Sequence, residues 1–172
     1  MRRILALVVT LGIMAGGAYA AGFVFVATPL EDTSITNAEF LADDIPNCSV
    51  VAYWNTASQG WIQHPNNSPI NNFAVAVSMP YMATVTADGI WTLCGGVPDS
   101  TSYLNLYQLA AGFSTIMLPL NMTYYTTAEQ VIQSVSQCNN IAYWNAASQG
   151  WVQHPQGTPI NNFVPKVGYP YM

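Results

Sequence analysis

Few residues in this chain have the types and spacing of a catalytic or metal-binding site. His64 and His154 each stand alone before a proline, with no second His, Cys or carboxylate at the spacing of a metal site. The sequence contains no Gly-x-Ser-x-Gly nucleophile motif, no glycine-rich phosphate loop and no metal-ligand pair at helical spacing. We therefore interpret the two histidines as loop residues, and we predict neither a metal nor another cofactor.

The eight carboxylates do not suggest a hydrolase site. Glu39 and Glu129 fit helix caps, and Asp88 fits an Asp-Gly turn. A paired-acid hydrolase would have to take its acids from loops that differ between the two halves of the chain. The sequence therefore predicts that the protein is not an enzyme.

Three cysteines leave an odd thiol. Cys94 follows a predicted strand and Cys48 precedes another in the same half of the chain. We predict a Cys48–Cys94 bridge if the compartment is oxidising. Cys138 has no such partner in its own half, so it is predicted to be free or bonded to another subunit.

An internal repeat with a spacing of 90 residues organises the chain. Residues 52–65 return as residues 142–155, and 22 of the 35 positions from Cys48 to Met82 are identical in the second copy. Such a repeat marks two related modules. The aromatic residues that both copies keep, and that we expect in their cores, are Tyr53, Trp54, Trp61, Phe73 and Tyr81 in repeat 1 and Tyr143, Trp144, Trp151, Phe163 and Tyr171 in repeat 2.

The tryptophan pairs Trp54/Trp61 and Trp144/Trp151 allow two interpretations. They could form a sugar-binding platform, or they could be hairpin partners that cover the core. We favour the second, because both copies keep the whole local motif, turn included, and not the aromatic residues alone.

Residues 1–20 have the pattern of a secretory signal peptide. A basic start precedes a short apolar run and the small-x-small sequence Ala18-Tyr19-Ala20. An uncleaved membrane anchor is less favoured, because the apolar run is short and interrupted by glycines. Cleavage would leave repeat 1 as residues 21–110, with a closing hairpin and linker, and repeat 2 as residues 111–172.

Beyond the leader, Lys166 is the only cation. The composition therefore gives no basic patch for nucleic acid or for a membrane surface. With 51% hydrophobic and 6% charged residues, the chain is expected to fold and to have surfaces that adhere to other surfaces.

Each repeat is predicted to contain strands and one short helix. Thr36 with Glu39, and Thr126 with Glu129, have the spacing of a capping box before a helix. Many short strands separated by turns predict a mainly β fold of two tandem β-sandwich or barrel-like modules, each with one short α-helix. The predicted strands are residues 23–28, 50–54, 60–64, 73–77, 103–109 and 114–118, with a closing hairpin over residues 83–93.

The two repeats differ at their ends. Repeat 2 has no counterpart of residues 83–110, and repeat 1 has no counterpart of residues 103–109 ahead of its first strand. Each module is therefore expected to lack an edge element that the other has. Repeat 2 could close on residues 83–93 and 103–109 of its own chain, or it could accept a strand from another copy. For the second case, residues 21–27 are the first donor candidate and residues 83–93 the second.

The repeat resembles a module of secreted prokaryotic cell-surface proteins. The resemblance rests on Leu-Pro-Leu at residues 118–120, the Thr-x-x-Glu helix, the sequence from Ile141 to Trp151, Asn-Asn-Phe at residues 161–163 and Gly-x-Pro-Tyr at residues 168–171. Repeat 1 departs from it with Thr28 and Ser78. The resemblance implies an extracellular β-rich fold with a role in assembly, and it implies no catalytic residues.

We therefore expect a secreted, extracellular structural subunit whose partner is another copy of itself. Strand exchange would join copies head to tail into a filament, tube or sheath, without a nucleic acid partner and without a membrane once the leader is removed. The alternative is a monomeric adhesin or carbohydrate-binding module that binds surface glycans. Asn47, Asn66 and Asn121 stand in Asn-x-Ser/Thr sequons, whose glycosylation depends on the host.

Overall fold

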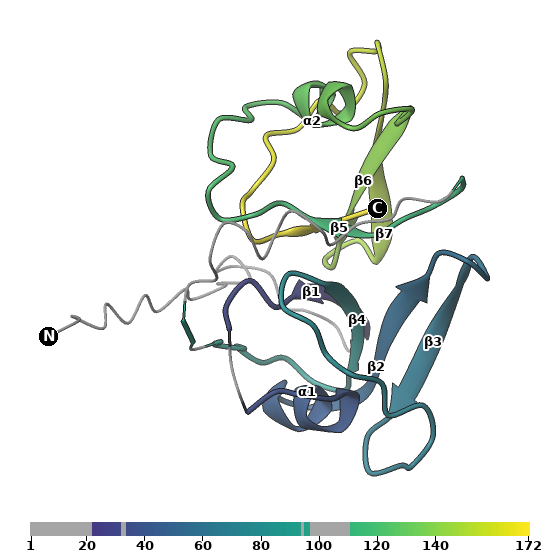
Figure 1. Cartoon of the computed structure of the whole chain (residues 1–172), viewed down its shortest axis with the longest axis vertical. Helices are drawn as coiled ribbons and strands as arrows, with labels where there is room; N and C mark the ends of the chain where they lie inside the picture. The colour runs from purple at the N-terminus through teal and green to yellow at the C-terminus, as the bar shows by residue number, and fades with distance from the viewer. Residues whose placement is uncertain (1–21, 32–33, 94, 97–110) are drawn as a thin grey trace, which may run out of the picture.

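The structure is a computed structural model that describes residues 22–31, 34–93, 95–96 and 111–172. The fold is mainly β, with antiparallel strand pairs and two short helices. Figure 1 shows the two repeats one above the other, with α1 and α2 on their outer sides. The predicted signal peptide and the predicted strand over residues 103–109 lie outside the described residues. No helix among the described residues has the length and hydropathy needed to span a membrane.

Repeat 1 contains one four-stranded antiparallel sheet in the order β1-β4-β2-β3. β1 and β4 pair along six residues, from Gly22 opposite Val85 to Ala27 opposite Pro80. The helix α1 contacts β2 and β3. The elements are β1 (Gly22–Ala27), α1 (Ala38–Asp44), β2 (Cys48–Asn55), β3 (Gly60–Pro65) and β4 (Pro80–Val85).

Repeat 2 has the same elements, but three of its strands are shorter. β5 pairs with β8 through only two residue pairs, and β6 pairs with β7 in the register of β2 with β3. The backbones of Ala142 and Met172 exchange two hydrogen bonds of 2.7 and 2.9 Å, which join the end of β8 to β6. The elements are β5 (Ile116–Met117), α2 (Ala128–Ser134), β6 (Asn140–Asn145), β7 (Gly150–Pro155) and β8 (Pro170–Tyr171).

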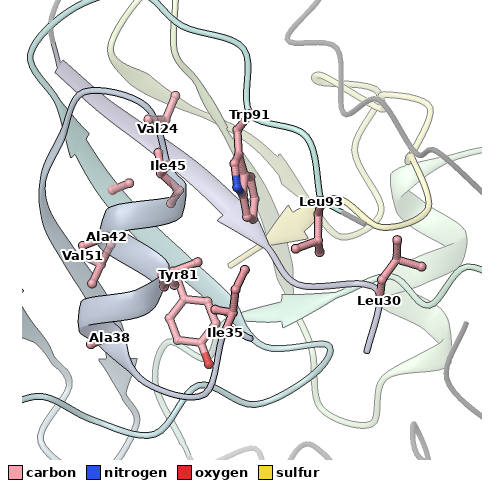
Figure 2. Packing of buried hydrophobic residues seen from close by; sticks show 12 residues of the cluster. Val24, Leu30, Ile35, Ala38, Ala42, Ile45, Val51, Tyr81, Trp91 and Leu93 are labelled. Atoms are coloured by element: carbon pink, nitrogen blue, oxygen red, sulfur yellow. The ribbon is translucent and has the colours of Figure 1, made fainter. Parts of the chain in front are cut away.

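The core of repeat 1 lies between the sheet and α1. Val51, Ala83 and Leu41 are completely buried in it, and apolar residues at helical spacing give α1 its buried face. Trp91 and Leu93 also enter this core (Figure 2), and the indole Nε1 of Trp91 donates to the Asp44 carboxylate at 2.6 Å. The predicted hairpin over residues 83–93 is therefore wrong, because β4 ends at Val85 and these two side chains pack inward instead.

The core of repeat 2 is smaller but has the same aromatic geometry. Phe73 stacks on Tyr81 at 6.0 Å and Phe163 stacks on Tyr171 at 5.9 Å, each with an interplanar angle of 3°. Tyr53 and Tyr143 meet these phenylalanines edge-on at 4.8 Å. These six aromatic residues lie in or against the two cores, as predicted.

The helix caps lie one residue later than predicted. The N-cap of α1 is Asn37, whose Oδ1 accepts from the backbone N–H of Phe40 at 3.0 Å. The N-cap of α2 is Thr127, and its capping box uses Gln130 rather than Glu129. Thr36 and Thr126 are therefore not the caps, and Glu39 and Glu129 are left for another role.

Two further predictions of local structure are wrong. Residues 73–77 form a single bridge, Ala74 with Asn37, and not a strand. Cys48 is a free thiol, which contradicts its bridge to Cys94, and Cys94 itself lies outside the described residues. Cys138 is also a free thiol, and the thiols of Cys48 and Cys138 contact the carbonyl oxygens of Val50 and Asn140 at 3.3 and 3.2 Å.

Candidate functional site

The repeated Trp-Asn-x-x-Ser-Gln motif contacts the backbone of the other repeat. In repeat 2, Trp144 Nε1 donates to the carbonyl oxygen of Phe23 at 2.8 Å. Gln149 accepts from the backbone N–H of Phe23 at 2.8 Å and donates to its carbonyl oxygen at 3.1 Å. The backbone of one β1 residue, Phe23, is therefore held by three hydrogen bonds from a hairpin more than 120 residues away.

Repeat 1 makes the same contact in the opposite direction. Trp54 Nε1 donates to the carbonyl oxygen of Phe113 at 2.8 Å, while Gln59 accepts from its N–H at 2.7 Å and donates to its carbonyl at 3.0 Å. We call these two sets of bonds the reciprocal clamp. The interface between the repeats is therefore self-complementary, like that of a two-fold symmetric dimer within one chain.

The turn of each hairpin positions the clamp glutamine. Asn55 Oδ1 accepts from the N–H groups of Ala57 and Ser58, and the next residue, Gln59, has a positive φ of 50°. The backbone that this glutamine contacts in the other repeat must lie close to it. A Cβ at Gly112, or at the corresponding Gly22, would collide with the clamp glutamine. These requirements explain why both repeats keep the hairpin turn and the Ala-Gly-Phe sequence.

The tryptophans serve this interface. Trp54 meets Trp61 edge-on at 5.3 Å, and Trp144 meets Trp151 in the same way. Phe25 lies 5.9 Å from Trp61 and 5.4 Å from Trp151, so it contacts both hairpins. The four tryptophans were predicted to be hairpin partners that cover the core. They are cross-strand partners in their hairpins, and Trp54, Trp144 and Trp151 also contact the other repeat.

Each predicted loop histidine is completely buried at the end of a strand. His154 Nδ1 lies 2.7 Å from the carbonyl oxygen of Ile160, and Nε2 lies 2.9 Å from Glu129 Oε2. His64 makes the same pair of contacts with Ile70 and with Glu39, at 2.7 and 2.6 Å. The interpretation as loop residues is therefore wrong, and the two glutamates that were assigned to caps are partners of the histidines.

The hydrogen-bond partners constrain the protons of each pair. A carbonyl oxygen can only accept, so Nδ1 of each histidine donates to the loop carbonyl, and Nε2 forms one further hydrogen bond with the glutamate oxygen. The N–H of Gly157 donates to Glu129 at 2.9 Å, and this bond lowers the pKa of Glu129 against the opposing effect of burial, with further help from His154 and Gln133. Each His–Glu pair joins the first turn of its helix to the end of a strand, and the histidine also bonds to the loop that follows that strand.

The two repeats differ between the first strand and β2 or β6, where repeat 2 has an open slot among the described residues. In repeat 1, Ala83, Thr84 and Val85 of β4 lie between β1 and β2 and pair with both. In repeat 2, β8 ends at Tyr171, and no described residue occupies the corresponding place between residues 112–114 and the start of β6. We call this gap the strand slot.

The strand slot opens into a cavity with a largely uncharged lining. This cavity of about 490 Å³ has an apolar wall that includes Val131, Val135 and Ile141. Two buried oxygens in its lining, Ser114 Oγ and Asn140 Oδ1, have no hydrogen-bond partner among the described residues.

The remaining predicted site residues lie apart from the slot. Asn47 has a positive φ of 59° and its amide donates to the carbonyl oxygen of Asp88 at 3.0 Å, while the Asn66 amide contacts the carbonyl oxygen of Cys48 at 3.4 Å. Asn121 is exposed. No group of three or more His, Cys, Asp or Glu side chains suited to a metal ion occurs among the described residues.

Comparison with known proteins gives no relative to guide the assignment of function. No family model, no curated protein and no solved structure matches the chain. The resemblance to cell-surface modules therefore stays a prediction, and the reciprocal clamp and the strand slot are interpreted from their own geometry.

Proposed function

We propose that this chain is a structural subunit of an extracellular polymer in which a strand of one copy enters the strand slot of the next. Under this proposal both repeats are β-sandwich or barrel-like modules. Repeat 1 completes its sheet with β4, and repeat 2 is completed by a neighbouring copy. The observation that carries the proposal is the strand slot itself, at the place where the related repeat holds a strand of its own.

The physical argument is that an open slot exposes both apolar core and unpaired backbone. Phe113 gives its N–H and carbonyl to the clamp, and its neighbours Gly112 and Ser114 line the slot. Natural proteins protect such an edge with charge, proline or a covering element. The slot has no charged side chain in its described lining, and an added strand would satisfy its backbone and fill its core.

The two donor segments predicted from the sequence are not free to leave. Residues 22–27 form β1 and pair along their whole length with β4, and Ala83 is completely buried in the core of repeat 1. Donating either would open that core. The proposal therefore assigns the donor strand to another segment of the second copy. Since donor and acceptor are different surfaces, the contact is head to tail and produces a ring or an open helical filament.

A monomeric carbohydrate-binding module is the second candidate. A cavity of about 370 Å³ between the repeats has Tyr143, Trp144 and Asn145 in its lining, together with Asp88 and Lys166. Aromatic faces with a few polar groups suit a sugar ring. Trp144 and Asn145 already serve the clamp and the hairpin turn, so a structural explanation for them exists.

The test is to fill the slot from within the chain. The full chain, expressed with its leader, is compared with a variant that continues after Met172 with the sequence Ala-Thr-Val-Thr-Ala-Asp, which follows Met82 in repeat 1. A matched control carries Asp-Thr-Pro-Thr-Ala-Asp, which places a charge and a proline at the two inward positions. Light scattering with size-exclusion chromatography and negative-stain microscopy measure assembly at increasing concentration.

We expect polymers from the unmodified chain and from the control, and monomers from the variant with the filled slot. Polymers of unchanged length and rate from that variant would show that the slot is not the joint. A monomeric unmodified chain at millimolar concentration would refute the polymer. Binding of an oligosaccharide by that monomer, lost in Tyr143→Ala, would support the second candidate.

A further inference from the structure

The surfaces through which the two repeats meet are nearly the same on both sides. The rings of Phe23 and Trp144 lie 6.4 Å apart at an interplanar angle of 83°, and those of Phe113 and Trp54 lie 6.5 Å apart at 86°. The bonds of the reciprocal clamp likewise run in both directions. Each repeat therefore carries both halves of the clamp, namely a Trp-Gln pair that binds and a backbone segment that is bound.

One position of the first strand breaks this symmetry. β1 lies where the two repeats meet (Figure 1), and its residues Phe23 and Phe25 both contact tryptophans of repeat 2. The residues 90 positions later are Phe113 and Thr115. Because Ile116 packs against the core of repeat 2, the alternation of an extended chain places Thr115 on the same side as Phe113, toward repeat 1.

Phe25 lies close to the pseudo-two-fold axis that relates the repeats. Its ring is 5.9 Å from Trp61 of its own repeat and 5.4 Å from Trp151 of the other, and these two tryptophans occupy equivalent positions. A side chain that contacts both members of an equivalent pair lies near the axis between them, so its own equivalent, Thr115, lies near the same axis. Both side chains are buried, with 7% and 5% of their surface exposed.

This pair of one large and one small side chain decides which repeats fit together. Two copies of repeat 1 would bring two phenylalanines to one axis, and a close-packed interior accommodates extra volume poorly. Two copies of repeat 2 would bring two threonines there and leave a cavity. Only the pairing of unlike repeats places one phenylalanine beside one threonine.

We propose that this interface, which consists of the reciprocal clamp with Phe25 and Thr115, also joins separate copies of the chain. Repeat 1 of one copy accepts repeat 2 of a second copy, and Phe25 with Thr115 excludes the pairing of like repeats. A repeat of another copy presents the same residues, so an exchange between copies keeps every clamp bond and aromatic contact. Exchange of identical elements in this way is a low-cost route to dimers.

The inference goes beyond the proposed strand insertion. Neither Phe25 nor Thr115 belongs to the described lining of the strand slot. Two copies that exchange reciprocally through the clamp form a closed dimer, whereas exchange from copy to copy forms an open chain. The partner is in both cases the opposite repeat of a second copy.

Two variants of the full chain test this specificity. Phe25→Thr places two small residues at the axis, and Thr115→Phe places two large ones there. Each variant closes poorly on itself, but repeat 1 of each fits repeat 2 of the other. The two variants are refolded together from urea in equal amounts, and native mass spectrometry distinguishes mixed pairs from pairs of like chains by their mass. The control is the double variant, which exchanges the large and the small residue within one chain.

We expect mixed pairs to exceed pairs of like chains at least about tenfold, because a mismatch of about 1.4 kcal/mol already gives that ratio. The double variant should match the natural chain in its distribution between monomer and dimer. Mixed pairs in only the statistical proportion would overturn the inference. A mixture that stays monomeric would overturn it as well.

Thermal unfolding of the same proteins provides a second test if a single variant folds poorly. Phe25→Thr should lower the melting temperature by roughly 6–12 °C through the cavity that it leaves, and Thr115→Phe by roughly 2–6 °C through excess volume. The double variant should melt above Phe25→Thr, because a phenylalanine then fills the same space from the other repeat. A double variant that melts below both single variants would show that the two residues do not share the axis.

The outcome is separable from that of the proposed function. Both single variants keep the strand slot, so assembly through the slot alone would join like and unlike chains without preference. A preference for mixed pairs, in a protein whose natural chain never forms polymers, would support the specificity of the clamp and refute the polymer. Polymers that form through the slot while mixed pairs stay statistical would support strand insertion and refute exchange through the clamp.

Discussion

Trp144 Nε1 lies 2.8 Å from the carbonyl oxygen of Phe23, a residue 121 positions earlier in the chain, and Trp54 makes the same bond to Phe113. The motif that the two repeats share most completely is therefore the means by which they hold each other. Because the clamp residues bond to the backbone atoms of the other repeat, these hydrogen bonds do not depend on the identity of the side chain at the bonded position. This explains how one motif serves two repeats whose first strands differ in sequence.

The first prediction concerns the clamp glutamine. Gln149→Ala removes two bonds to Phe23 and one to the carbonyl oxygen of Ala146. These bonds are exposed to solvent, so we expect a loss of about 1 kcal/mol in the free energy of unfolding, measured by urea denaturation. Gln63→Ala is the control, because Gln63 is an exposed glutamine of the hairpin in repeat 1. Equal effects of the two substitutions would contradict a role for the clamp.

The second prediction separates the true helix caps from their neighbours. Asn37→Ala and Thr127→Ala should each cost about 1 kcal/mol, because each removes the oxygen that accepts from the first turn of its helix. Thr36→Ala is the control and should cost little, because Thr36 is exposed and lies outside the cap of α1. A larger loss at Thr36 than at Asn37 would restore the capping box expected from the sequence.

The third prediction concerns alkaline stability. Tyr81 Oη accepts from the N–H of Ala76 at 2.8 Å, and burial raises the pKa of Tyr81 to about 12. Burial also raises the pKa of Tyr171, whose Oη accepts a hydrogen bond from the backbone N–H of Lys166. Since the folded-state pKa lies above the ordinary value of 10.0, this contribution is complete below pH 10 and is lost as the pH rises through 12.

Alkaline titration of stability measures this effect. Tyr81→Phe should lower stability at neutral pH by about 1–2 kcal/mol, because it leaves the Ala76 N–H without its partner. It should also flatten the fall in stability between pH 10 and 12. The half-buried Tyr53 provides the control, and a Tyr53→Phe variant should keep the slope. An unchanged slope in Tyr81→Phe would contradict the assignment.

The elements that local sequence determines could be predicted. The strands of the two hairpins and the buried faces of the helices follow from alternation and helical spacing, and they lie within a few residues of the expected positions. Helix caps were misplaced by one residue, because Thr36-Asn37 and Thr126-Thr127 each offer two adjacent capping side chains. The prediction of a hairpin over residues 83–93 was wrong, because the side chains of Trp91 and Leu93 are buried in the core and do not continue an edge strand.

The contacts between distant residues could not be predicted. The clamp joins side chains to backbone atoms, which have no sequence signature of their own. The one available signal was that both repeats keep Ala-Gly-Phe together with the hairpin motif. The ion pairs were missed because Glu39 and His64 are 25 residues apart, and only the fold shows that the end of β3 reaches the first turn of α1. That both copies keep the pair was a signal that we assigned to capping.

The last prediction concerns the buried pair of His154 and Glu129. His154 is completely buried and bonds to both Ile160 and Glu129, so His154→Ala should cost about 3 kcal/mol through the lost packing and the unpaired carbonyl.

Glu129→Gln tests the charge, because a glutamine amide can donate to a neutral imidazole without carrying a charge. The folded protein lowers the pKa of Glu129, chiefly through the N–H of Gly157, so its contribution is present above the ordinary value of 4.5 and is lost as the pH falls through the folded value. Stability measured from pH 7 to pH 2 should therefore fall less steeply in Glu129→Gln than in the natural chain. Asp43→Asn, at an exposed carboxylate of α1, is the control and should keep the natural slope. If Glu129→Gln and Asp43→Asn have the same acid profile, the pair is not an ionic contact and serves only to fill space.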